Sequence, residues 1–586
     1  MILIETRHLF YTWPGADRSA IDGLDLRIGA GEYVAIVGRN GSGKSTLLRL
    51  FDGLILPSSG EVAVDGHKTD DPASIWEIRA ACALVFQSPR DQLAASVVEE
   101  DAAFGPLNLG VSRQEAVARA GEALGAVGLL EERRRPVHAL SAGQQQRLAI
   151  AGALAMNPRC IAFDEATSML DPPSRTAVLD LMDGLVGRGI AVVHVTHDME
   201  EACRASRIVV LARGKAVFDG SPAALFGLED PESPPPALAL GLALPPNLTL
   251  TRALGLEGNL HEGIEKLAGR IASTGGTGKR NAPSAVSPPH AEAREVMTPF
   301  VFGLEAASYS YLHGTEAEVV ALEDLDMVLD RGKSLALVGK TGSGKSTLLQ
   351  LLDALARPTR GRAVSFGIDT AARDADLGAL RIRAPLSVQR PETALFETFA
   401  GDDVAFGPRN LGLKGGDLVK RVSAWMEAVG LPFKLFRDRQ VRSLSGGEKR
   451  RLALAGVFAM ESEAILLDEP TASLDPETAA AVRALISGAG KRGATLVIAT
   501  HSMEEAAKAD LMAVVSHGRM LAFGPPVELF YESFDPAWEI GRPRAVEIAI
   551  ALGRLGVALA DRPLDMPSLI GALGRGGQAL EGRVAS

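Results

Sequence analysis

Two glycine-rich segments of this chain carry the residue types that bind phosphate groups. Residues 38–45 read GRNGSGKS, residues 339–346 read GKTGSGKS, and both fit the pattern GxxxxGK[ST]. Each segment follows a strand-like apolar run and precedes a helical run, TLLRLFDGL or TLLQLLDAL. Glycines let consecutive backbone N–H groups converge on phosphate oxygens, and the N-terminus of the following helix adds the positive end of its dipole. The sequence therefore predicts two nucleotide-phosphate sites.

The lysine and the serine that close each segment have separate predicted roles. Lys44 and Lys345 are expected to hold the β- and γ-phosphates, and Ser45 and Ser346 are expected to bind Mg²⁺. The predicted nucleotide-binding residues of the two segments are Gly38, Asn40, Gly41, Ser42, Gly43, Lys44, Ser45 and Thr46, and Gly339, Thr341, Gly342, Ser343, Gly344, Lys345, Ser346 and Thr347.

A pair of acidic residues ends a strand-like run in each half of the chain. The pairs are Asp164 with Glu165 and Asp468 with Glu469. The first acid of each pair suits a Mg²⁺ site, usually through water, and the second is placed to polarise an attacking water. A carboxylate pair after a strand is often only a turn that caps a helix, but a phosphate segment upstream favours catalysis. The two pairs predict nucleotide hydrolysis.

Two serines begin segments of the form Ser-x-x-Gln/Glu. Ser141 begins SAGQ and Ser445 begins SGGE, and both fit the capping box that starts a helix. An exposed helix N-terminus with a glycine, here Gly143 or Gly447, also favours anions. These segments therefore predict two helix starts that can each receive a γ-phosphate from another domain.

The motifs recur because the chain contains two copies of one unit. AFGPLNLG at residues 103–110 returns as AFGPRNLG at 405–412, and LSAGQQQRLAIAG, DEATSMLDP and THDMEEA return in the same order as LSGGEKRRLALAG, DEPTASLDP and THSMEEA. Strand-like runs end just before the chemical residues at 33–37, 160–163, 191–196, 335–338, 465–467 and 494–500. Strands that alternate with helices indicate a parallel sheet with chemistry at the strand carboxyl ends.

The predicted fold is α/β, with two tandem phosphate-loop domains that are each followed by a short helical extension. Residues 269–297 contain STGGTGKRNAPSAVSPP, which favours a flexible linker with a stretched reach of about 90 Å. The predicted boundaries are 1–225 for the first domain, 226–268 for its extension, 269–297 for the linker, 298–530 for the second domain and 531–586 for its extension.

Composition excludes several other classes of protein. The 586 residues carry a net charge of −11, which argues against a protein that neutralises nucleic-acid phosphates. Cys82, Cys160 and Cys203 form no CxxC pair, which argues against a disulfide framework, a zinc ribbon or an iron–sulfur cluster. No signal peptide and no run of 18 apolar residues is present in the sequence, so a cytoplasmic protein is expected.

Together, the motifs resemble those of the ATP-binding-cassette (ABC) ATPases over nearly all of both copies. The matching set is GxxxxGKST, a Gln after an apolar strand, LS[AG]G[QE], the Asp-Glu pair, SxLD and a strand-terminal His. In that family two cassettes pair head to tail, and the phosphate loop of one and the signature serine of the other enclose each ATP. The resemblance implies one site from Lys44, Ser45, Gln87, Asp164, Glu165 and His197 with Ser445 and Gly447, and another from Lys345, Ser346, Gln389, Asp468, Glu469 and His501 with Ser141 and Gly143.

The resemblance also implies roles for residues that the spacing alone leaves open. It places Gln87 and Gln389 among both the catalytic and the Mg²⁺-binding residues, and His197 and His501 at the γ-phosphate. Trp13 and Tyr311 occupy the positions that stack on adenine in the family, although either could be a half-buried strand residue. The departures from the family pattern, Ala142 and Ala166, remove no catalytic group. Two competent sites are therefore expected.

A narrower resemblance involves the segment after each Gln. Residues 87–110, QSPRDQLAASVVEEDAAFGPLNLG, are similar to a stretch of the energy-coupling factor transporter ATPases, which drive uptake of vitamins, cobalt or nickel. The second copy keeps DDVAFGPRNLG but has Thr393 and Ala394 where the first has Asp91 and Gln92. This segment would form the groove for the coupling helices of a membrane subunit, and the inequality of the two copies would suit two different helices.

The resemblance thus implies the ATPase subunit of an energy-coupling factor importer, with ATP and Mg²⁺ bound at the cytoplasmic face of the membrane. Its expected partners are a transmembrane coupling subunit and a membrane substrate-binding subunit, with no nucleic acid, and its two cassettes are expected to pair within one chain. Two alternatives stay open: the ATPase of a conventional sugar or peptide importer, and a soluble twin-cassette protein that acts on ribosomes or DNA. The AFGPxNLG repeats and the short Gly/Pro-rich linker favour the first interpretation.

Overall fold

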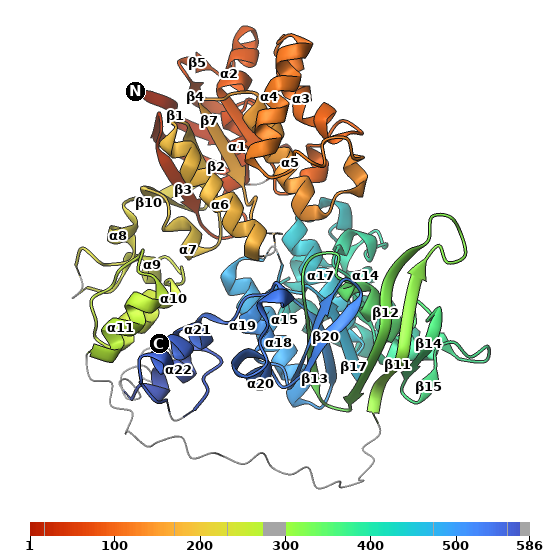
Figure 1. Ribbon diagram of the computed structural model, residues 1–586. Coiled ribbons are helices and arrows are strands. Elements are labelled where there is room, and N and C mark those ends of the chain that lie inside the picture. The colour runs from red at the N-terminus through yellow and green to blue at the C-terminus, as the bar shows by residue number, and fades with distance from the viewer. Residues whose placement is uncertain are drawn as a thin grey trace. The chain divides into compact units, whose positions relative to one another are not determined.

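The computed structural model describes residues 1–16, 18–168, 170, 172–230, 233–273, 300–472, 474–559 and 561–574. The chain divides into two compact units (Figure 1). The first unit contains Met1–Arg252 and Leu256–His261, and the second contains Ala253–Gly255 and Glu262–Ser586. Each unit is described below by itself.

The first unit contains two sheets. A four-stranded antiparallel sheet has the order β2-β1-β4-β5, and a six-stranded sheet has the order β10-β9-β3-β8-β7-β6, in which only the edge strand β10 is antiparallel to its neighbour. The strands are β1 (Ile2–Tyr11), β2 (Ile21–Gly29), β3 (Tyr33–Val37), β4 (Ser59–Val64), β5 (His67–Lys68), β6 (Cys82–Val85), β7 (Cys160–Asp164), β8 (Ala191–Val195), β9 (Arg207–Ala212) and β10 (Lys215–Gly220).

The helices of the first unit follow its strands in the order expected for an α/β protein. They are α1 (Lys44–Phe51), α2 (Ile75–Ala81), α3 (Val98–Asn108), α4 (Arg113–Ala126), α5 (Ala142–Ala155), α6 (Pro172–Gly187), α7 (Met199–Ala202), α8 (Pro222–Leu225), α9 (Pro236–Ala239) and α10 (Pro246–Ala253).

The central strands of the larger sheet are apolar on both faces because both faces are covered. In β3, Val34 and Ile36 enter one core with α1 and the antiparallel sheet, while Tyr33 and Val37 enter a second core with α4, α5 and α6. Successive side chains of a strand point to opposite faces, so a strand buried on both sides reads as a continuous apolar run. The runs at 33–37 and 191–196 in the sequence have this cause.

The second unit repeats both sheets with the same connections, β12-β11-β14-β15 and β16-β17-β18-β13-β19-β20. Its strands are β11 (Phe300–Tyr311), β12 (Val319–Asp330), β13 (Ser334–Val338), β14 (Arg360–Ser365), β15 (Ile368–Asp369), β16 (Leu386–Ser387), β17 (Ala464–Asp468), β18 (Thr495–Ala499), β19 (Leu511–Ser516) and β20 (Arg519–Gly524). The α/β fold in two tandem copies is therefore confirmed. The separate antiparallel sheet in each copy was not part of the prediction.

The helices of the second unit include one that precedes its first strand. They are α11 (Ile264–Ser273), α12 (Lys345–Leu352), α13 (Leu377–Arg383), α14 (Ala400–Asn410), α15 (Gly415–Ala428), α16 (Phe433–Phe436), α17 (Gly446–Ala459), α18 (Pro476–Lys491), α19 (Met503–Ala506), α20 (Pro526–Tyr531), α21 (Arg544–Arg554) and α22 (Met566–Ala572).

Helix α11 packs against α21, so the second unit contains a segment that follows the first copy in the sequence. Its apolar side is buried through Leu267 and Ile271, and Glu265 forms an ion pair of 3.1 Å with Arg554 of α21. The helix extends to Ser273, inside the range that the sequence assigns to a linker. The remainder of that range, 274–297, and the last residues of the second extension, 575–586, lie outside the described residues, and the domain boundaries stay predictions.

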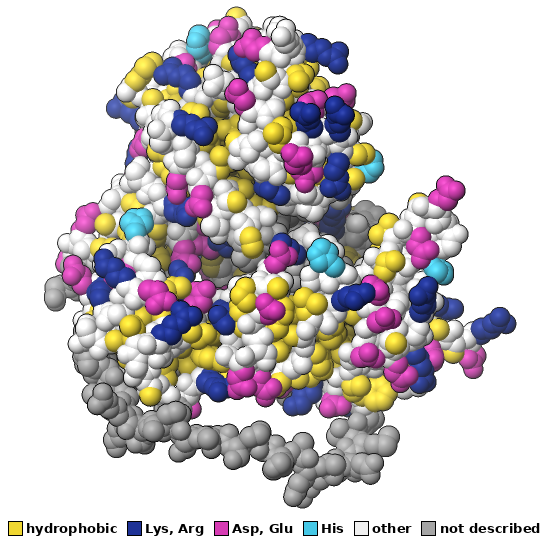
Figure 2. All heavy atoms as spheres, viewed as in Figure 1, with side chains coloured by type: hydrophobic (Ala, Val, Ile, Leu, Met, Phe, Trp, Pro, Cys, Tyr) yellow, Lys and Arg dark blue, Asp and Glu magenta, His cyan; other side chains and the backbone are white. Residues whose placement is uncertain are grey.

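Charged side chains of both signs alternate over each unit on the face that Figure 2 shows, where no extended basic area is visible. Among the described residues, no helix combines the length and apolarity that crossing a membrane requires.

Both units place an acidic residue at the end of the helix that follows the phosphate loop, half-buried in the first unit and buried in the second. Asp52 ends α1 and Asp353 ends α12, where the helix dipole also disfavours a negative charge. Burial raises the pKa of Asp52 to about 7 and the pKa of Asp353 to about 8, although Arg79 and Arg381 oppose the shift. A carboxyl with a raised folded-state pKa stabilises the fold fully below its unfolded pKa of about 4, and this contribution is lost as pH rises through the folded value.

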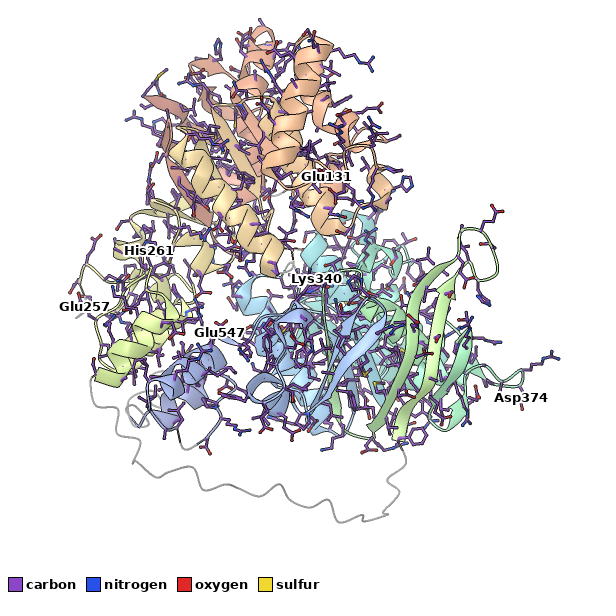
Figure 3. The ribbon with its side chains drawn as sticks, viewed as in Figure 1. Glu131, Glu257, His261, Lys340, Asp374 and Glu547 are labelled. Atoms are coloured by element: carbon purple, nitrogen blue, oxygen red, sulfur yellow. The ribbon has the colours of Figure 1, made fainter. Side chains whose placement is uncertain are left out.

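We therefore expect Asp353→Asn to stabilise the protein at alkaline pH. The neutral amide removes the cost of burying a carboxylate, so the melting temperature should rise by roughly 2–4 °C at pH 8.5 and by less at pH 5. Thermal unfolding followed at both pH values measures the difference. Asp374→Asn is the control, because Asp374 is exposed on a loop of the same unit (Figure 3). An equal effect of Asp353→Asn at both pH values would contradict the assignment.

Candidate functional site

Each phosphate loop connects a buried strand to a helix, β3 to α1 in the first unit and β13 to α12 in the second. Gly38 has a φ of 148°, and a Cβ there would lie 2.2 Å from the carbonyl oxygen of Leu211. Gly339 has a φ of 146°, and a Cβ there would lie 2.0 Å from the carbonyl oxygen of Val515. The first glycine of the pattern is therefore required by both conformation and space.

The lysine of each loop lies inside the turn. Lys44 Nζ donates to the carbonyl oxygens of Gly38 at 2.7 Å and Arg39 at 3.1 Å. Lys345 Nζ makes the same two bonds, to Gly339 at 2.6 Å and Lys340 at 2.8 Å. Both ammonium groups are thus held beside the N-terminus of a helix, an arrangement that favours a phosphate group. The predicted loop residues that are buried are Gly38, Ser42, Lys44, Thr46, Gly339, Ser343, Lys345 and Thr347, and those that are exposed or half-buried are Asn40, Gly41, Gly43, Ser45, Thr341, Gly342, Gly344 and Ser346.

The serine after each lysine contacts the first acid of the Asp-Glu pair. Ser45 Oγ donates to Asp164 Oδ1 at 2.9 Å. Burial raises the pKa of Asp164 to about 6, and the hydrogen bond from Ser45 opposes this shift. Burial also raises the pKa of Asp468, and Ser346 opposes it in the same way. A hydroxyl and a carboxylate oxygen that share one site are the ligands that Mg²⁺ takes, so these pairs fit the cation.

The second acid of each pair lies where the strand ends and the backbone turns. Glu165 follows β7 with a φ of 50°, and its N–H donates to the carbonyl oxygen of Val195 at 3.1 Å. Glu469 repeats this after β17, with a φ of 50° and an N–H bond of 2.9 Å to Ala499. A non-glycine residue in the left-handed region is uncommon and often belongs to a functional site.

This turn directs both glutamates toward the predicted glutamine and histidine. Glu165 Oε2 accepts from Gln87 Nε2 at 2.8 Å, and Glu165 Oε1 lies 2.6 Å from His197 Nε2. In the second unit, Glu469 Oε1 lies 2.7 Å from His501 Nε2, and Gln389 also hydrogen-bonds the carboxylate.

The electrostatic surroundings of Glu469 keep its carboxyl group ionised. Burial raises the pKa of Glu469, but the hydrogen bond from His501 and the charges of His501 and Lys345 outweigh burial and hold the pKa below its usual value. An ionised carboxylate beside a phosphate site is able to accept a proton from water.

The two predicted aromatic residues lie beside the last threonine of their own phosphate loop. Trp13 Nε1 approaches Thr46 Oγ1 at 3.4 Å, and Tyr311 Oη lies 2.9 Å from Thr347 Oγ1. Both rings are partly exposed, and each is braced edge-on by a tyrosine two residues earlier on the strand. An exposed ring face next to a phosphate site suits a stacked base.

The signature serines begin helices as predicted. Ser141 starts α5 and Ser445 starts α17, and both have a complete capping box with the Gln or Glu three residues later. The serines are exposed, and Gly143 and Gly447 lie in the first turn of these helices. The capping-box prediction is confirmed, and the assignment of these residues to the ATP bound by the other unit stays a prediction.

A carboxylate that the motifs did not identify organises the loop after each Gln. Asp101 Oδ1 accepts from the N–H groups of Ala94 at 2.7 Å and Ala95 at 2.8 Å. Asp403 accepts in the same way from two consecutive N–H groups, both at 3.0 Å. The signal in the sequence was an aspartate at the matching position of both copies, before AFGP.

Asp91 and Gln92, which the sequence places together in a coupling groove, have different surroundings. Asp91 is exposed. Gln92 instead accepts from the N–H of Phe86 at 3.1 Å and donates to the carbonyl oxygen of Ala149 at 3.4 Å. Gln92 therefore supports the residue before Gln87 from within the protein.

Large apolar side chains are exposed near these loops in both units. Phe104 and Leu107 of α3 are 48% and 43% exposed. In the second unit, Phe406 of α14 is 40% exposed, and Phe396 packs against its ring with a centroid distance of 4.7 Å. We call these the α3 patch and the α14 patch. Exposed apolar patches of this kind are typical of protein-binding surfaces.

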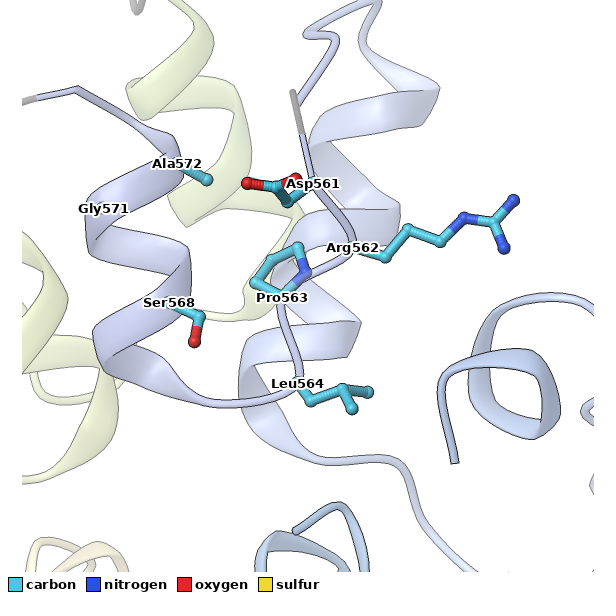
Figure 4. A pocket seen from close by; sticks show the side chains of 7 residues that line it. All are labelled: Asp561, Arg562, Pro563, Leu564, Ser568, Gly571 and Ala572. Atoms are coloured by element: carbon cyan, nitrogen blue, oxygen red, sulfur yellow. The ribbon is translucent and has the colours of Figure 1, made fainter. Parts of the chain in front are cut away.

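A hollow in the second extension contains none of the predicted site residues. It is lined by side chains of the segment before α22 and of α22 itself (Figure 4), namely Asp561, Arg562, Pro563, Leu564, Ser568, Gly571 and Ala572.

Comparison with known proteins agrees with this arrangement in both units. The family model described as "ABC transporter" matches residues 21–168 and again residues 322–472. A protein of Bifidobacterium longum that carries the name of an ABC transporter ATP-binding protein is 36% identical over 504 residues, which are 83% of this chain and 61% of that protein. This chain therefore spans about three fifths of that relative.

Two further relatives differ in length. A protein of Methanosarcina mazei with the same type of name is 32% identical over 572 residues, which are 94% of each chain. An energy-coupling factor transporter ATP-binding protein, EcfA1 of Symbiobacterium thermophilum, is 48% identical over 242 residues, which are 41% of this chain and 83% of that protein.

Proposed function

Since this chain belongs to the ABC transporter family and carries two ATP-hydrolysing domains of that family in tandem, we propose that it drives an energy-coupling factor type importer for a vitamin or a transition-metal ion. Its partners in this proposal are a transmembrane coupling subunit and a membrane substrate-binding subunit, at the cytoplasmic face of the membrane. The 48% identity to an energy-coupling factor ATP-binding protein supports this transporter class over part of the chain.

The chemistry of each proposed site follows from the groups that surround its glutamate. The phosphate loop and Lys44 hold the β- and γ-phosphates of ATP. Glu165 accepts a proton from the water that attacks the γ-phosphate, while Gln87 and His197 hold its carboxylate in place. In the second unit, Lys345, Glu469, Gln389 and His501 perform the same tasks.

In this proposal, magnesium would be held at each site by a serine, an aspartate and a glutamine, and the contact between the serine and the aspartate supports the assignment. These are Ser45, Asp164 and Gln87 in the first unit and Ser346, Asp468 and Gln389 in the second. The bound cation supplies positive charge to the phosphate oxygens.

Each ATP in the proposal is enclosed by one phosphate loop and by the signature helix of the other cassette in the same chain. Support comes from the exposed serines at the N-termini of α5 and α17, where helix N–H groups favour an anion.

The observation that carries the coupling role is the pair of apolar patches at equivalent positions, the α3 patch and the α14 patch. Phe104, Leu107 and Phe406 lie on the helix that follows the loop of Gln87 or Gln389, and Phe396 lies just before that helix. Each patch therefore follows closely in the sequence on a glutamine that contacts the proposed catalytic glutamate. Binding and release of ATP could move a membrane subunit through this connection.

The test is a double substitution, Phe104→Asp with Phe406→Asp, in a chain co-expressed with the proposed coupling and substrate-binding subunits. A charge in each patch should abolish co-purification with the coupling subunit and ATP-dependent uptake. ATP hydrolysis by the isolated chain should stay within about twofold of wild type, because the patches lie outside the phosphate sites.

The matched control is Val217→Asp with Leu521→Asp. These residues lie at equivalent places on β10 and β20 and are 45% and 46% exposed. The control should assemble and transport normally. Normal assembly of the Phe104 and Phe406 variant would contradict the coupling role, and uptake that requires a soluble solute-binding protein would identify a conventional importer instead.

A further inference from the structure

The two units hold the loop of the predicted glutamine by different polar groups. The relevant position lies three residues after the signature glycine, where α5 has Gln146 and α17 has Arg450. Both side chains are almost fully buried, with exposed fractions of 3% and 8%. The exchange of an amide for a guanidinium at a buried position changes both the charge and the reach of the side chain.

In the second unit, Arg450 joins the main chains of two proposed site residues. Its Nη1 donates to the carbonyl oxygen of Glu469 at 2.7 Å, and its Nη2 donates to the carbonyl oxygen of Gln389 at 2.6 Å. The guanidinium is planar and rigid, so these two short bonds set the distance between the two backbones. Gln389 and Glu469 are therefore linked twice, by their side chains and through Arg450.

In the first unit, neutral side chains hold the backbone of the glutamine loop and the backbone of the glutamate. Gln146 Nε2 donates to the carbonyl oxygen of Phe86 at 3.2 Å, and Gln92 Oε1 accepts from the N–H of the same residue. The carbonyl oxygen of Glu165 is bonded separately, by the hydroxyl of Ser168 at 2.9 Å.

All three of these groups are replaced together in the second unit. Gln92, Gln146 and Ser168 correspond to Ala394, Arg450 and Ala472, and neither alanine can make a side-chain hydrogen bond. Arg450 thus takes over the carbonyl that a serine hydroxyl binds in the first unit, and it holds the glutamine loop without help from residue 394.

We propose that Arg450 is a positioning residue that couples the Gln389 loop to the catalytic carboxylate of Glu469, in the second site only. If the Gln389 loop moves, the rigid guanidinium of Arg450 moves the backbone of Glu469 with it. In the first site, the backbones of the loop and the glutamate are held by separate bonds, and only the side-chain bond between Gln87 and Glu165 joins them, so the same displacement is transmitted less directly. The inference rests on the proposed hydrolysis of ATP at Glu469.

The test compares ATP hydrolysis in three variants of the full chain. Arg450→Gln should lower kcat by about tenfold and leave KM for ATP within about twofold, because the carboxylate is misplaced while the phosphate loop is intact. Arg450→Lys keeps the charge but offers one nitrogen where the rigid guanidinium uses two, so it should restore less than half of the loss. The triple variant Arg450→Gln, Ala394→Gln, Ala472→Ser installs the arrangement of the first unit and should restore most of it.

Each variant is measured in the wild-type chain and in the Glu165→Gln chain. If both sites are needed for each turnover, Arg450→Gln should show its full loss of kcat in the wild-type chain. If the two sites hydrolyse ATP independently, the full loss of kcat should appear in the Glu165→Gln chain, where Glu469 is the remaining base. The control is Arg421→Gln, which removes a guanidinium that donates to the carbonyl oxygen of Ala459, at the other end of α17. It should leave kcat within about twofold in both backgrounds.

The outcomes separate this inference from the proposed function. A wild-type chain without ATPase activity would overturn the proposed function itself. An active wild type with unchanged kcat in folded Arg450→Gln would overturn only the positioning role. The same conclusion follows if Arg450→Lys restores full activity, or if kcat and the melting temperature fall together and the triple variant restores neither.

Discussion

A chain with Glu165→Gln and Glu469→Gln should bind ATP normally and hydrolyse it at least about 10²-fold more slowly than wild type, as expected for the loss of a general base. The substitution keeps the shape of each side chain and its hydrogen bond with Gln87 or Gln389, but an amide does not accept the proton of the attacking water. The measurement pairs phosphate release with the binding of a fluorescent ATP analogue.

The matched control for this double variant is Glu61→Gln with Glu323→Gln. Both glutamates are partly exposed and form ion pairs at the surface of their units, with Lys68 and Arg519. The control should hydrolyse ATP at the wild-type rate, since exposed ion pairs contribute little to stability. Wild-type turnover by the Glu165 and Glu469 variant would contradict the assignment of the base.

The second large effect is expected at the phosphate loops. Lys44→Ala with Lys345→Ala should weaken ATP binding by roughly 10- to 100-fold, the size expected for a lost charge-assisted bond. Each ammonium group is held inside its loop by two carbonyl oxygens, beside the helix N-terminus where the phosphates are proposed to bind. Titration calorimetry with a non-hydrolysable ATP analogue measures the change in affinity.

A control for charge alone is Lys215→Ala with Lys333→Ala. Lys215 and Lys333 are exposed and pair with acidic residues of their own units, Asp22 and Asp510. Their removal changes the net charge of the chain by the same amount and should leave the affinity for ATP within about twofold. An equal loss of affinity in both variants would mean that the loop lysines act only through net charge.

The parts that the sequence predicted well are those where a short pattern has one physical solution. The strands before Gly38 and Asp164 were predictable because a short, continuous apolar run is typical of a parallel strand that is covered on both faces of its sheet. The capping boxes at Ser141 and Ser445 were predictable because the hydrogen bonds are local.

The contacts that the sequence did not reveal depend on tertiary packing. An amphipathic pattern shows that α11 has an apolar side, but only the packing of α21 shows which unit covers it. A glutamine such as Gln92 is equally compatible with a surface groove and with a bond to the backbone of Phe86. Arg450 looks like an ordinary helix residue until the carbonyl groups of Gln389 and Glu469 are placed around it.

The left-handed backbone at Glu165 and Glu469 places the proposed chemistry in conflict with thermostability. An L-residue in this conformation costs roughly 1–2 kcal/mol, and glycine adopts it without that cost. A screen for thermostability alone should therefore select glycine at positions 165 and 469, which would give a more stable protein that lacks the catalytic base. Engineering of a more robust form of this protein has to hold these two residues fixed and seek its gain elsewhere, for instance at the buried carboxyl of Asp353.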